Sequence, residues 1–542
     1  MEKFVNKCKE STLHWAEVQT KQSQRLGYFM DWPNSYYTMS EENNYTIWFF
    51  LKKCFEKGLI YKGRDSVPWC PRCGTAISQH EILQEEYQEI THDSVFFRLP
   101  VVDRPAEFFL VWTTTPWTLP ANVALAVNPT LEYWLVKKEN FNYWVVAGLA
   151  KNLFGDRVQP LRKALGQDLV GLRYTGPFDS LPAVKKAREE KPETFHTVVA
   201  SEELVVATEG TGIVHIATGC GQEDFALGKQ TDLPVIAAID EAANYLEGFG
   251  DLSGKNAKDD PLLVLNHPLL ADFIFKITPY AHRYPVCWRC HTELVWRVVD
   301  EWYIKMDPLR EPLKKSARQA RWIPNWGLDR ELDWLEHMSD WLISKKRYWG
   351  LALPIWECTE CGNFEVIGSK EELEKKAVEG FEEFAGHTPH RPWVDKVKIK
   401  CSKCGKIVSR VPDVGNPWLD AGIVPYSTLI DPKTKKVSYL TDKKYWQEWF
   451  PADFITECFP GQFKNWFYSI LAMSTVLEGK SPFKVLLGHA LVRDEKGEEM
   501  HKTKGNAIWF DEAAEKMGVD VMRWMYVRQN PELNLNFGYH LA

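Results

Sequence analysis

The spacing of apolar residues changes along the chain from a helical to a strand-like pattern. Within residues 1–65, Trp48, Leu51 and Phe55 recur three or four positions apart, which places them on one face of a helix. Between about 96 and 280 the apolar residues come instead in short runs bounded by turn-forming residues. The pattern therefore predicts a helical segment followed by a β-rich block.

Individual strands can be placed within the β-rich block. Tyr133–Lys138 and Tyr143–Val146 flank a short polar turn, which predicts a hairpin. The other strand-like runs are FFLVW at 108–112, NVALAV at 122–127, TVVA at 197–200 and LVVA at 204–207.

After residue 300 the pattern is mixed again. FITE and FKVLLGHALV, both after residue 450, read as buried parallel strands around a helix at 463–478. A β-rich block thus lies between two segments that read as α/β. This order is typical of a domain inserted into a nucleotide-binding fold.

Composition narrows the class of protein. The 542 residues are 45% apolar and 26% charged, which indicates a globular chain of several domains. The net charge of −7 excludes a strongly basic nucleic-acid binder but still allows local basic patches. The uncharged window 108–131 contains three prolines, so it predicts strand-turn-strand rather than a membrane span. MEKFVNKCKE at the N-terminus lacks the apolar core of a signal peptide, which predicts a cytoplasmic location without membrane insertion.

Eight of the 12 cysteines form Cys-x-x-Cys pairs, and two such pairs can complete a tetrahedral Zn²⁺ site. The third and fourth pairs lie close in sequence and predict one zinc ribbon, which leaves the first and second to combine across more than 200 residues. We expect two closed structural sites, of which the split one would clamp the base of the insertion. The pairs are Cys70/Cys73, Cys287/Cys290, Cys358/Cys361 and Cys401/Cys404.

Several motifs resemble those of class I aminoacyl-tRNA synthetases. The run GHALVRDEKGEEMHKTKGN at 488–506 resembles their Lys-Met-Ser-Lys-Ser loop, which closes over ATP phosphates. In that comparison Lys502 matches the second lysine, and Gly505 and Asn506 match the residues that follow the loop. A lysine on such a loop can neutralise charge on pyrophosphate as it leaves.

Other segments resemble the isoleucyl branch of that family and occur in the family's order. WTTTPWTLPANVALAVNP at 112–129 is similar to the threonine-rich strand of its editing domain, and EGTGIVHIATGCGQEDF at 209–225 to the partner segment. Valyl and leucyl relatives continue the threonine strand as Thr-Arg-Pro, so the sequence here favours isoleucine. The remaining matches are WLISKKRYWG at 341–350, NPWLDAG at 416–422 and ECFPGQFKNWFYS at 457–469.

The resemblance implies an α/β fold: a class I Rossmann-type nucleotide-binding catalytic domain, incomplete at its N-terminus, with a large β-rich editing insertion and zinc ribbons. Neither a His-Ile-Gly-His signature nor a helical anticodon-binding domain occurs in the sequence, so we expect a partial form whose missing segment a separate chain can supply. The expected parts are a partial catalytic domain at 1–65, the zinc-clamped base of the insertion at 66–95 and 281–335, the editing domain at 96–280, a catalytic-core segment with the second zinc ribbon at 336–415, and the second half of the catalytic domain at 416–542.

The resemblance also implies ATP-dependent activation of isoleucine, with Mg²⁺, and its transfer to tRNA(Ile). Trp466 and Asp420 would line the amino-acid pocket, although core packing and a turn or cap are their open alternatives. The residues implied at ATP are Lys502, Gln462, Gly461, Gly505 and Asn506. We expect no isoleucine-dependent ATP–pyrophosphate exchange from the chain alone.

A second, hydrolytic site is implied for removing valine. Isoleucine and valine differ by one methylene, and a binding pocket gains only about 1–3 kcal/mol of discrimination from such a difference. Isoleucyl-tRNA synthetases are the usual example of this limit. Asp224 matches the family's anion for the substrate ammonium, and Cys220 is expected to be a buried small residue rather than a nucleophile. The side chains implied at the ester and ribose oxygens are Thr113, Thr114, Thr115, Thr118 and Asn122.

Two other functions stay open. The chain could be a free-standing deacylase that uses only the insertion, or a non-catalytic zinc-ribbon RNA-binding protein. Basic clusters at 314–321 and 345–347 could contact tRNA phosphates or form a solvated face. Retention of Lys502, NPWLDAG and WLISKKRYWG favours the ligase, because a pure hydrolase needs none of them.

Overall fold

The computed structural model describes residues 1–77, 87–500 and 505–542. Within these ranges the fold is mixed α/β, and no helix is long and apolar enough to cross a membrane.

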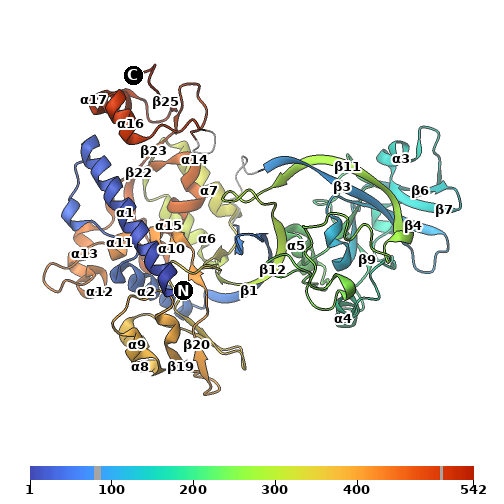
Figure 1. The fold of residues 1–542 in the computed structure, drawn as a ribbon, viewed down its shortest axis with the longest axis horizontal. Coiled ribbons are helices and arrows are strands. Elements are labelled where there is room, and N and C mark those ends of the chain that lie inside the picture. Colours follow the sequence, from blue (N-terminus) through green and yellow to red (C-terminus); the bar gives the residue numbers. More distant parts are fainter. Residues whose placement is uncertain (78–86, 501–504) are drawn as a thin grey trace. The chain divides into compact units, whose positions relative to one another are not determined.

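The chain divides into two compact units (Figure 1). Unit 1 combines Met1–Gly63 with Glu301–Ala542, and unit 2 is Arg64–Asp300. The chain passes from one unit to the other within strands β1 (Ile60–Cys70) and β12 (Val295–Ile304). Unit 2 is thus a continuous insertion between the two parts of unit 1. The finer division into five parts stays a prediction.

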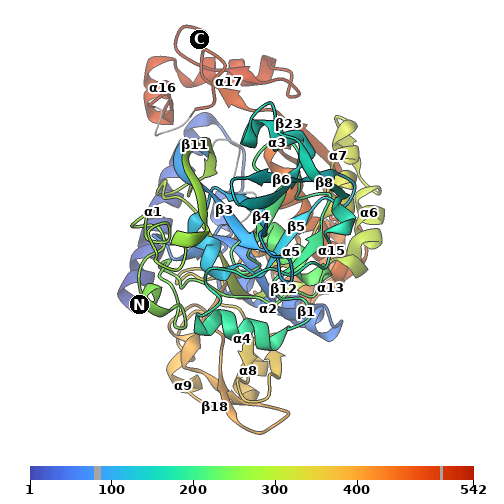
Figure 2. The ribbon, with the colours of Figure 1, turned by 90° about the vertical axis from the view of Figure 1, so that its right-hand side faces the viewer.

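Unit 2 is built on a nine-stranded sheet, which faces the viewer in Figure 2. Seven strands lie in the order β8-β6-β7-β4-β10-β5-β9, while β3 pairs with β4 and β11 with β3. The pair β3 and β11 forms the long ribbon visible in Figure 1. The bounds are β3 Tyr87–Pro100, β4 Glu107–Thr113, β5 Ala124–Val127, β6 Glu132–Lys138, β7 Phe141–Val146, β8 Pro160–Leu165, β9 Thr197–Ala200, β10 Ile213–Ile216 and β11 Ile274–Pro285.

The strand predictions for unit 2 are confirmed with one exception. β6 and β7 form the predicted hairpin, and its turn takes Glu139 into the left-handed region at φ 57°. Residues 204–207 are not a strand: the carbonyl of Val205 accepts a hydrogen bond from the Asn128 side chain instead of joining a ladder. The short helices of unit 2 are η4 Pro116–Ala121, α3 Ala147–Phe154, η5 Gly166–Asp168, α4 Pro182–Glu190, α5 Gln222–Gln230, η6 Gly250–Leu252 and η7 Ala271–Phe273.

Unit 1 contains a three-stranded parallel sheet in the order β13-β23-β22, with bounds Arg321–Ile323, Phe483–His489 and Ala452–Cys458. The two predicted parallel strands are confirmed, and the predicted helix between them is formed by η10 and α15. β22 is not the buried strand that the sequence predicts, because it lies at the sheet edge and leaves Phe454 54% exposed.

Helices surround this sheet. In α2 the Ser40 hydroxyl caps the first turn by accepting from the Asn43 N–H, and Trp48 and Leu51 are buried as their spacing predicts. The helices of unit 1 are α1 Glu2–Leu26, η1 Trp32–Asn34, α2 Glu41–Glu56, η8 Asp307–Leu309, α6 Arg310–Ala317, α7 Trp326–His337, α8 Lys370–Lys376, α9 Phe381–Phe384, η9 Val394–Lys396, α10 Pro417–Gly422, α11 Val424–Ser427, α12 Ser438–Thr441, α13 Lys443–Trp449, α14 Phe459–Gln462, the π-helix η10 Phe463–Phe467, α15 Tyr468–Glu478, α16 Phe510–Lys516 and α17 Val519–Arg528.

Short strands complete the two units. In unit 2, β2 pairs with β1 beside the first cysteine pair. In unit 1, β16 and β17 form one hairpin and β18, β19 and β20 a small sheet near the other cysteines. The bounds are β2 Thr75–Ala76, β14 Trp341–Leu342, β15 Ser344–Lys345, β16 Ile355–Glu357, β17 Phe364–Val366, β18 Ala377–Glu379, β19 Lys398–Lys400, β20 Ile407–Ser409, β21 Val414–Gly415, β24 Val492–Arg493 and β25 Leu535–Asn536.

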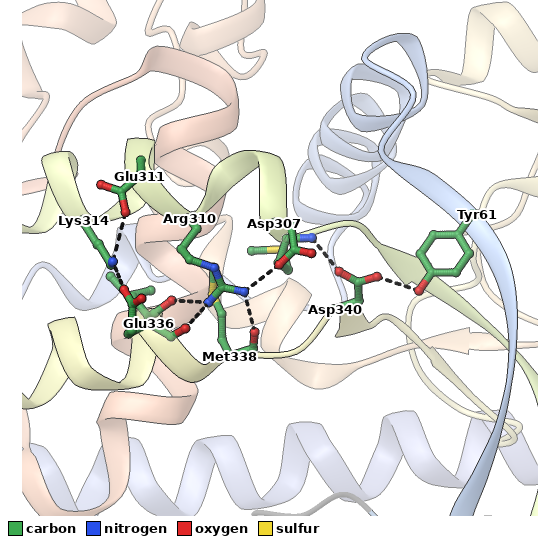
Figure 3. Close-up of polar contacts among 10 residues, drawn as sticks. Tyr61, Asp307, Arg310, Glu311, Lys314, Glu336, Met338 and Asp340 are labelled. Carbon is green, nitrogen blue, oxygen red and sulfur yellow. Dashed lines mark hydrogen bonds and ion pairs between the residues drawn. The ribbon is translucent and has the colours of Figure 1, made fainter. Parts of the chain in front are cut away.

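Arg310 holds the C-terminal end of α7 against α6 (Figure 3). Its guanidinium donates to the carbonyls of Leu335, Glu336 and Met338, at 2.7, 2.5 and 3.0 Å, and to the carboxylate of Asp307. Carbonyls in the last turn of a helix have no partner within the helix, so this arginine satisfies groups that would otherwise need water.

Candidate functional sites

The pairing of β4 with β10 brings two predicted motif segments together in unit 2. The strands are parallel, with Trp112 opposite Val214, so their carboxyl ends lie at the same edge. The threonine-rich segment 113–118 begins at the last residue of β4, and the segment that leads into α5 follows β10. Ligands bind at the carboxyl ends of parallel strands in many α/β folds, because side chains of successive loops converge there.

The four threonines differ in exposure. Thr113 and Thr118 are buried, whereas Thr114 and Thr115 are partly exposed. The Thr113 hydroxyl accepts from the Thr115 N–H at 3.2 Å and lies 3.3 Å from the Thr115 hydroxyl. The first three threonines therefore form one polar turn, part of which reaches the surface.

Thr118 and Asn122 point inward, onto His215 of β10. The Thr118 hydroxyl donates to the Thr115 carbonyl at 2.9 Å, so at its 2.9 Å contact with His215 Nε2 it accepts. The Asn122 amide donates to His215 Nδ1 at 2.7 Å. These two contacts fix His215 as the neutral tautomer with its proton on Nε2. Burial supports this state, because it lowers the pKa of His215 to about 3.

His215 is a site residue that the motif comparison did not single out. A lone histidine in an apolar strand such as IVHI is most often a core residue, so the sequence carries no strong signal for it. The usable clue is that period-2 alternation puts His215 and Ile213 on the same face of β10, opposite Val214.

Asp224 lies in the first turn of α5 and is tied back to the end of β10. Its Oδ2 accepts from the Ala217 N–H at 2.7 Å. Burial raises the pKa of this carboxyl to about 7, while the Ala217 hydrogen bond acts in the opposite direction. Asp224 is thus a half-buried carboxyl group that lacks a basic partner among the hydrogen bonds and ion pairs of the described residues.

Cys220 lies between Ala217 and Asp224 in the sequence, and its side chain is buried. Its N–H donates to the Ala217 carbonyl at 2.8 Å. Burial, followed by the nearby Asp224 carboxylate, raises the pKa of its thiol well above the ordinary value. A thiol that resists ionisation is a poor nucleophile, in keeping with the expected structural role.

In unit 1 the structure brings Asp420, Trp466 and Gln462 together. Trp466 in η10 donates from Nε1 to the Ala421 carbonyl of α10 at 3.0 Å, and its N–H donates to Gln462 Oε1 at 3.2 Å. Asp420 accepts from the Asn43 amide at 3.2 Å, and burial raises the pKa of its carboxyl to about 7. Gly461, one residue before Gln462, is exposed.

The lysine-loop residues are only partly described. Lys502 lies outside the described residues. Asn506 is held by the preceding loop, because its amide donates to Asp494 Oδ2 at 2.9 Å and to the Glu499 carbonyl at 3.0 Å. Gly505 has φ 71°, a left-handed conformation that favours glycine. Their roles at ATP stay predictions.

Two clusters of four cysteines form, one in each unit, and they group the pairs as the sequence suggested. In each cluster the four Sγ atoms lie within 4.8 Å of one another. Four thiolates at this spacing fit a tetrahedral Zn²⁺ site and leave no ligand position open. The clusters are Cys70, Cys73, Cys287 and Cys290 in unit 2, and Cys358, Cys361, Cys401 and Cys404 in unit 1.

Several of the basic residues are already paired. Lys346 contacts both carboxylate oxygens of Asp413, at 2.9 and 3.0 Å, and Lys345 is only 2% exposed. Lys314 bonds to Glu311 and Glu336 (Figure 3). Lys346 and Lys314 are therefore engaged by carboxylates of unit 1, and Lys345 is buried in it.

The fold is thus mixed α/β, with a β-rich insertion, one candidate site in each unit and two cysteine clusters. The family model of tRNA synthetases class I (I, L, M and V) matches residues 1–537, and the chain belongs to that family.

The relatives found by sequence include isoleucine–tRNA ligases. That of Saccharolobus solfataricus is 34% identical over 99% of this chain and 53% of its own length. That of Methanothermobacter thermautotrophicus is 36% identical over 98% of this chain and 49% of its own length. The chain spans about half the length of these curated relatives. A solved LeuRS–tRNA complex from Agrobacterium radiobacter K84 matches weakly, with 14% identity, a TM-score of 0.42, and coverage of 98% of this chain and 62% of that one.

Proposed function

We propose that the chain is part of an isoleucine–tRNA ligase, and that unit 2 hydrolyses valyl-tRNA(Ile). The observation that carries the proposal is the parallel pairing of β4 with β10, because it unites the threonine turn with the Asp224 segment.

In the proposed reaction water attacks the carbonyl carbon of the valyl ester. The C–O bond to the terminal ribose breaks, the ribose oxygen takes up a proton of that water, and valine and tRNA leave. Asp224, when ionised, binds the substrate ammonium, because a half-buried carboxylate without a basic partner attracts a cation. Thr114 and Thr115 are partly exposed and offer hydroxyl groups to the ester and ribose oxygens.

Thr113, Thr118 and Asn122 act less directly in this proposal. The hydroxyl of Thr113 is engaged with Thr115, and Thr118 and Asn122 both bond to His215. They keep the turn in one conformation, so its exposed hydroxyls and backbone are already placed when substrate arrives.

Unit 1 carries the proposed activation chemistry, in which isoleucine and ATP, with Mg²⁺, give isoleucyl-adenylate and pyrophosphate. By the resemblance, Gln462 and Gly461 would lie beside the adenosine, and Trp466 and Asp420 would line the amino-acid pocket. The hydrogen bonds from Trp466 to Gln462 and Ala421 support the proposal, because they keep these residues adjacent. Lys502 holds triphosphate charge, and Gly505 and Asn506 belong to the ATP-binding loop that follows it, as their match to the lysine loop implies. The cysteine clusters each hold one structural Zn²⁺.

The test measures deacylation of valyl-tRNA(Ile) by the 542-residue chain. We expect Asp224→Ala to lower the rate about 100-fold, because the substrate ammonium loses its counter-charge. Glu223→Ala is the matched control: its side chain is exposed, one position away, and we expect the rate to stay within twofold. Equal rates for wild type and Asp224→Ala would overturn the assignment of the hydrolytic site.

A further inference from the structure

Tyr174 lies behind the hydrolytic site, between η5 and α4. Its side chain is 2% exposed, and its N–H donates to the His196 carbonyl at 3.2 Å. Its ring stacks on the ring of His196, with centroids 4.5 Å apart and planes 20° apart. The ring is therefore held in place independently of its hydroxyl group.

The Tyr174 hydroxyl donates to Asn122 Oδ1 at 2.6 Å. The orientation of that amide is fixed on its other side, where the nitrogen faces the carbonyls of Ala124 and Ile216 at 3.0 and 3.4 Å. Since carbonyls only accept, the nitrogen belongs there and the oxygen must face Tyr174. Among the described residues, Tyr174 is the donor to this oxygen.

The hydrogen bonds beyond Asn122 all run in one direction. The Asn122 amide donates to His215 Nδ1, His215 Nε2–H donates to the Thr118 hydroxyl, and that hydroxyl donates to the Thr115 carbonyl. The chain ends on the threonine turn, at the Thr115 carbonyl. The His196 side chain supports the same asparagine, because its Nε2 lies 3.4 Å from the Asn122 main-chain carbonyl.

We propose that Tyr174 is a positioning residue of the hydrolytic site: its hydroxyl orients Asn122, and through Asn122 and His215 it sets the direction of the Thr118 hydroxyl and the shape of the threonine turn. The proposal rests on the proposed function for its catalytic consequence, but the hydrogen-bond order it describes can be measured without activity.

Removing the hydroxyl leaves Asn122 Oδ1 buried without a donor. The Asn122 amide is then no longer held in one orientation, so it can rotate, and His215 Nδ1 no longer faces a fixed donor. His215 can take either neutral tautomer, and the Thr118 hydroxyl can turn from the Thr115 carbonyl to the ring. The substrate groups are still bound, but the turn is less often in the reactive arrangement. The rate constant kcat should fall, while KM stays the same.

The kinetic experiment compares Tyr174→Phe with Tyr133→Phe in the full chain, using valyl-tRNA(Ile). Tyr133 is the matched control, because it is fully buried in the same core and its hydroxyl donates to the Gly212 carbonyl at 2.7 Å, away from Asn122. We expect Tyr174→Phe to lower kcat about tenfold with KM within twofold. Tyr133→Phe should leave both within twofold. Equal effects of the two variants on kcat, or no effect of Tyr174→Phe, would overturn the positioning role.

A second readout separates failure of this proposal from failure of the proposed function. The ring signals of His215 are recorded in ¹³C,¹⁵N-histidine-labelled chain and assigned by their loss in His215→Gln. We expect one Nε2–H tautomer in wild type and Tyr133→Phe, and exchange between two tautomers in Tyr174→Phe. An unchanged His215 spectrum in Tyr174→Phe would overturn the proposal, whether or not the wild type hydrolyses valyl-tRNA(Ile). If the wild type is inactive, only the function fails, and this spectrum decides the role of Tyr174.

Discussion

Two buried polar sites, one in each unit, differ in whether their groups have hydrogen-bond partners. In unit 2 the buried hydroxyl, amide and imidazole groups around His215 satisfy one another in a single directed chain. In unit 1 Glu331 of α7 is fully buried, and neither carboxylate oxygen has a hydrogen-bond partner among the described residues.

The groups around His215 can therefore organise a site, whereas the Glu331 carboxyl only lowers the stability of the fold. A satisfied buried network costs little stability and fixes side chains in one arrangement, which a catalytic site requires. An unpaired buried carboxyl costs free energy and positions nothing. We therefore expect substitutions in unit 2 to impair function, and substitution of Glu331 to improve stability.

The largest effect concerns the cysteine clusters, of which each unit has one. The unit 2 cluster joins cysteines 217 residues apart, and the unit 1 cluster joins cysteines 40 residues apart. Each of Cys287→Ser and Cys404→Ser should lower zinc content from two ions per chain to one. The entropic cost of closing a loop grows with the length of the loop. Cys287→Ser should therefore lower the free energy of unfolding by about 1.5 kcal/mol more than Cys404→Ser does. Metal analysis and urea unfolding measure both quantities, and wild-type chain with one zinc would contradict the pairing.

The second effect tests whether the network of unit 2 is functional. His215→Leu should lower valyl-tRNA(Ile) hydrolysis about 100-fold, because Thr118 and Asn122 lose their shared partner. His267→Leu is the control: this buried histidine in the same unit bonds to the exposed Asp251 and should leave hydrolysis within threefold. Similar losses in both variants would mean that His215 is only a core residue.

The third effect concerns Glu331 and runs the other way. Glu331→Leu should raise the free energy of unfolding by about 1–3 kcal/mol, because it removes an unpaired buried carboxyl. Burial raises the pKa of Glu331 in the folded state, so the stability contributed by its protonated form is complete below about pH 4.3, the unfolded value, and is lost as pH rises through the folded pKa. The advantage of the leucine variant should therefore grow with pH, as urea unfolding at several pH values will show. A loss of stability at neutral pH would mean that this carboxyl has a partner.

The smallest effect is the pH dependence of hydrolysis. Asp224 has a pKa raised to about 7 by burial, and its ionised form binds the ammonium. The rate should therefore rise about tenfold between pH 6 and 8 before levelling. Asp224→Ala should retain only the steady increase of uncatalysed ester hydrolysis. A wild-type profile that matches this variant would show that Asp224 does not titrate in the reaction.

Local patterns in the sequence predicted much of the fold. The 133–146 hairpin, the parallel strands after residue 450 and the grouping of the cysteines depend on residue period and spacing, which the sequence displays directly. The run 204–207 has strand composition, but its Val205 carbonyl bonds to a side chain from elsewhere. The exposure of β22 depends on its place at a sheet edge, which no local pattern reports.

The candidate site was predicted as a set of motifs rather than as an arrangement. The motif comparison treated Thr118 and Asn122 like the other threonines, although both turn away from the surface toward His215. That direction depends on the partners that β10 and Tyr174 supply from distant parts of the chain. Such partners become visible only when the strands are paired in space.

The most direct test of the central claim is a comparison of two substrates under single-turnover conditions. The wild-type chain is mixed with valyl-tRNA(Ile) or with isoleucyl-tRNA(Ile), and release of the amino acid is followed in time. The proposed hydrolytic role of unit 2 predicts rapid release of valine and release of isoleucine near the uncatalysed rate. Release of both amino acids at the uncatalysed rate would contradict it.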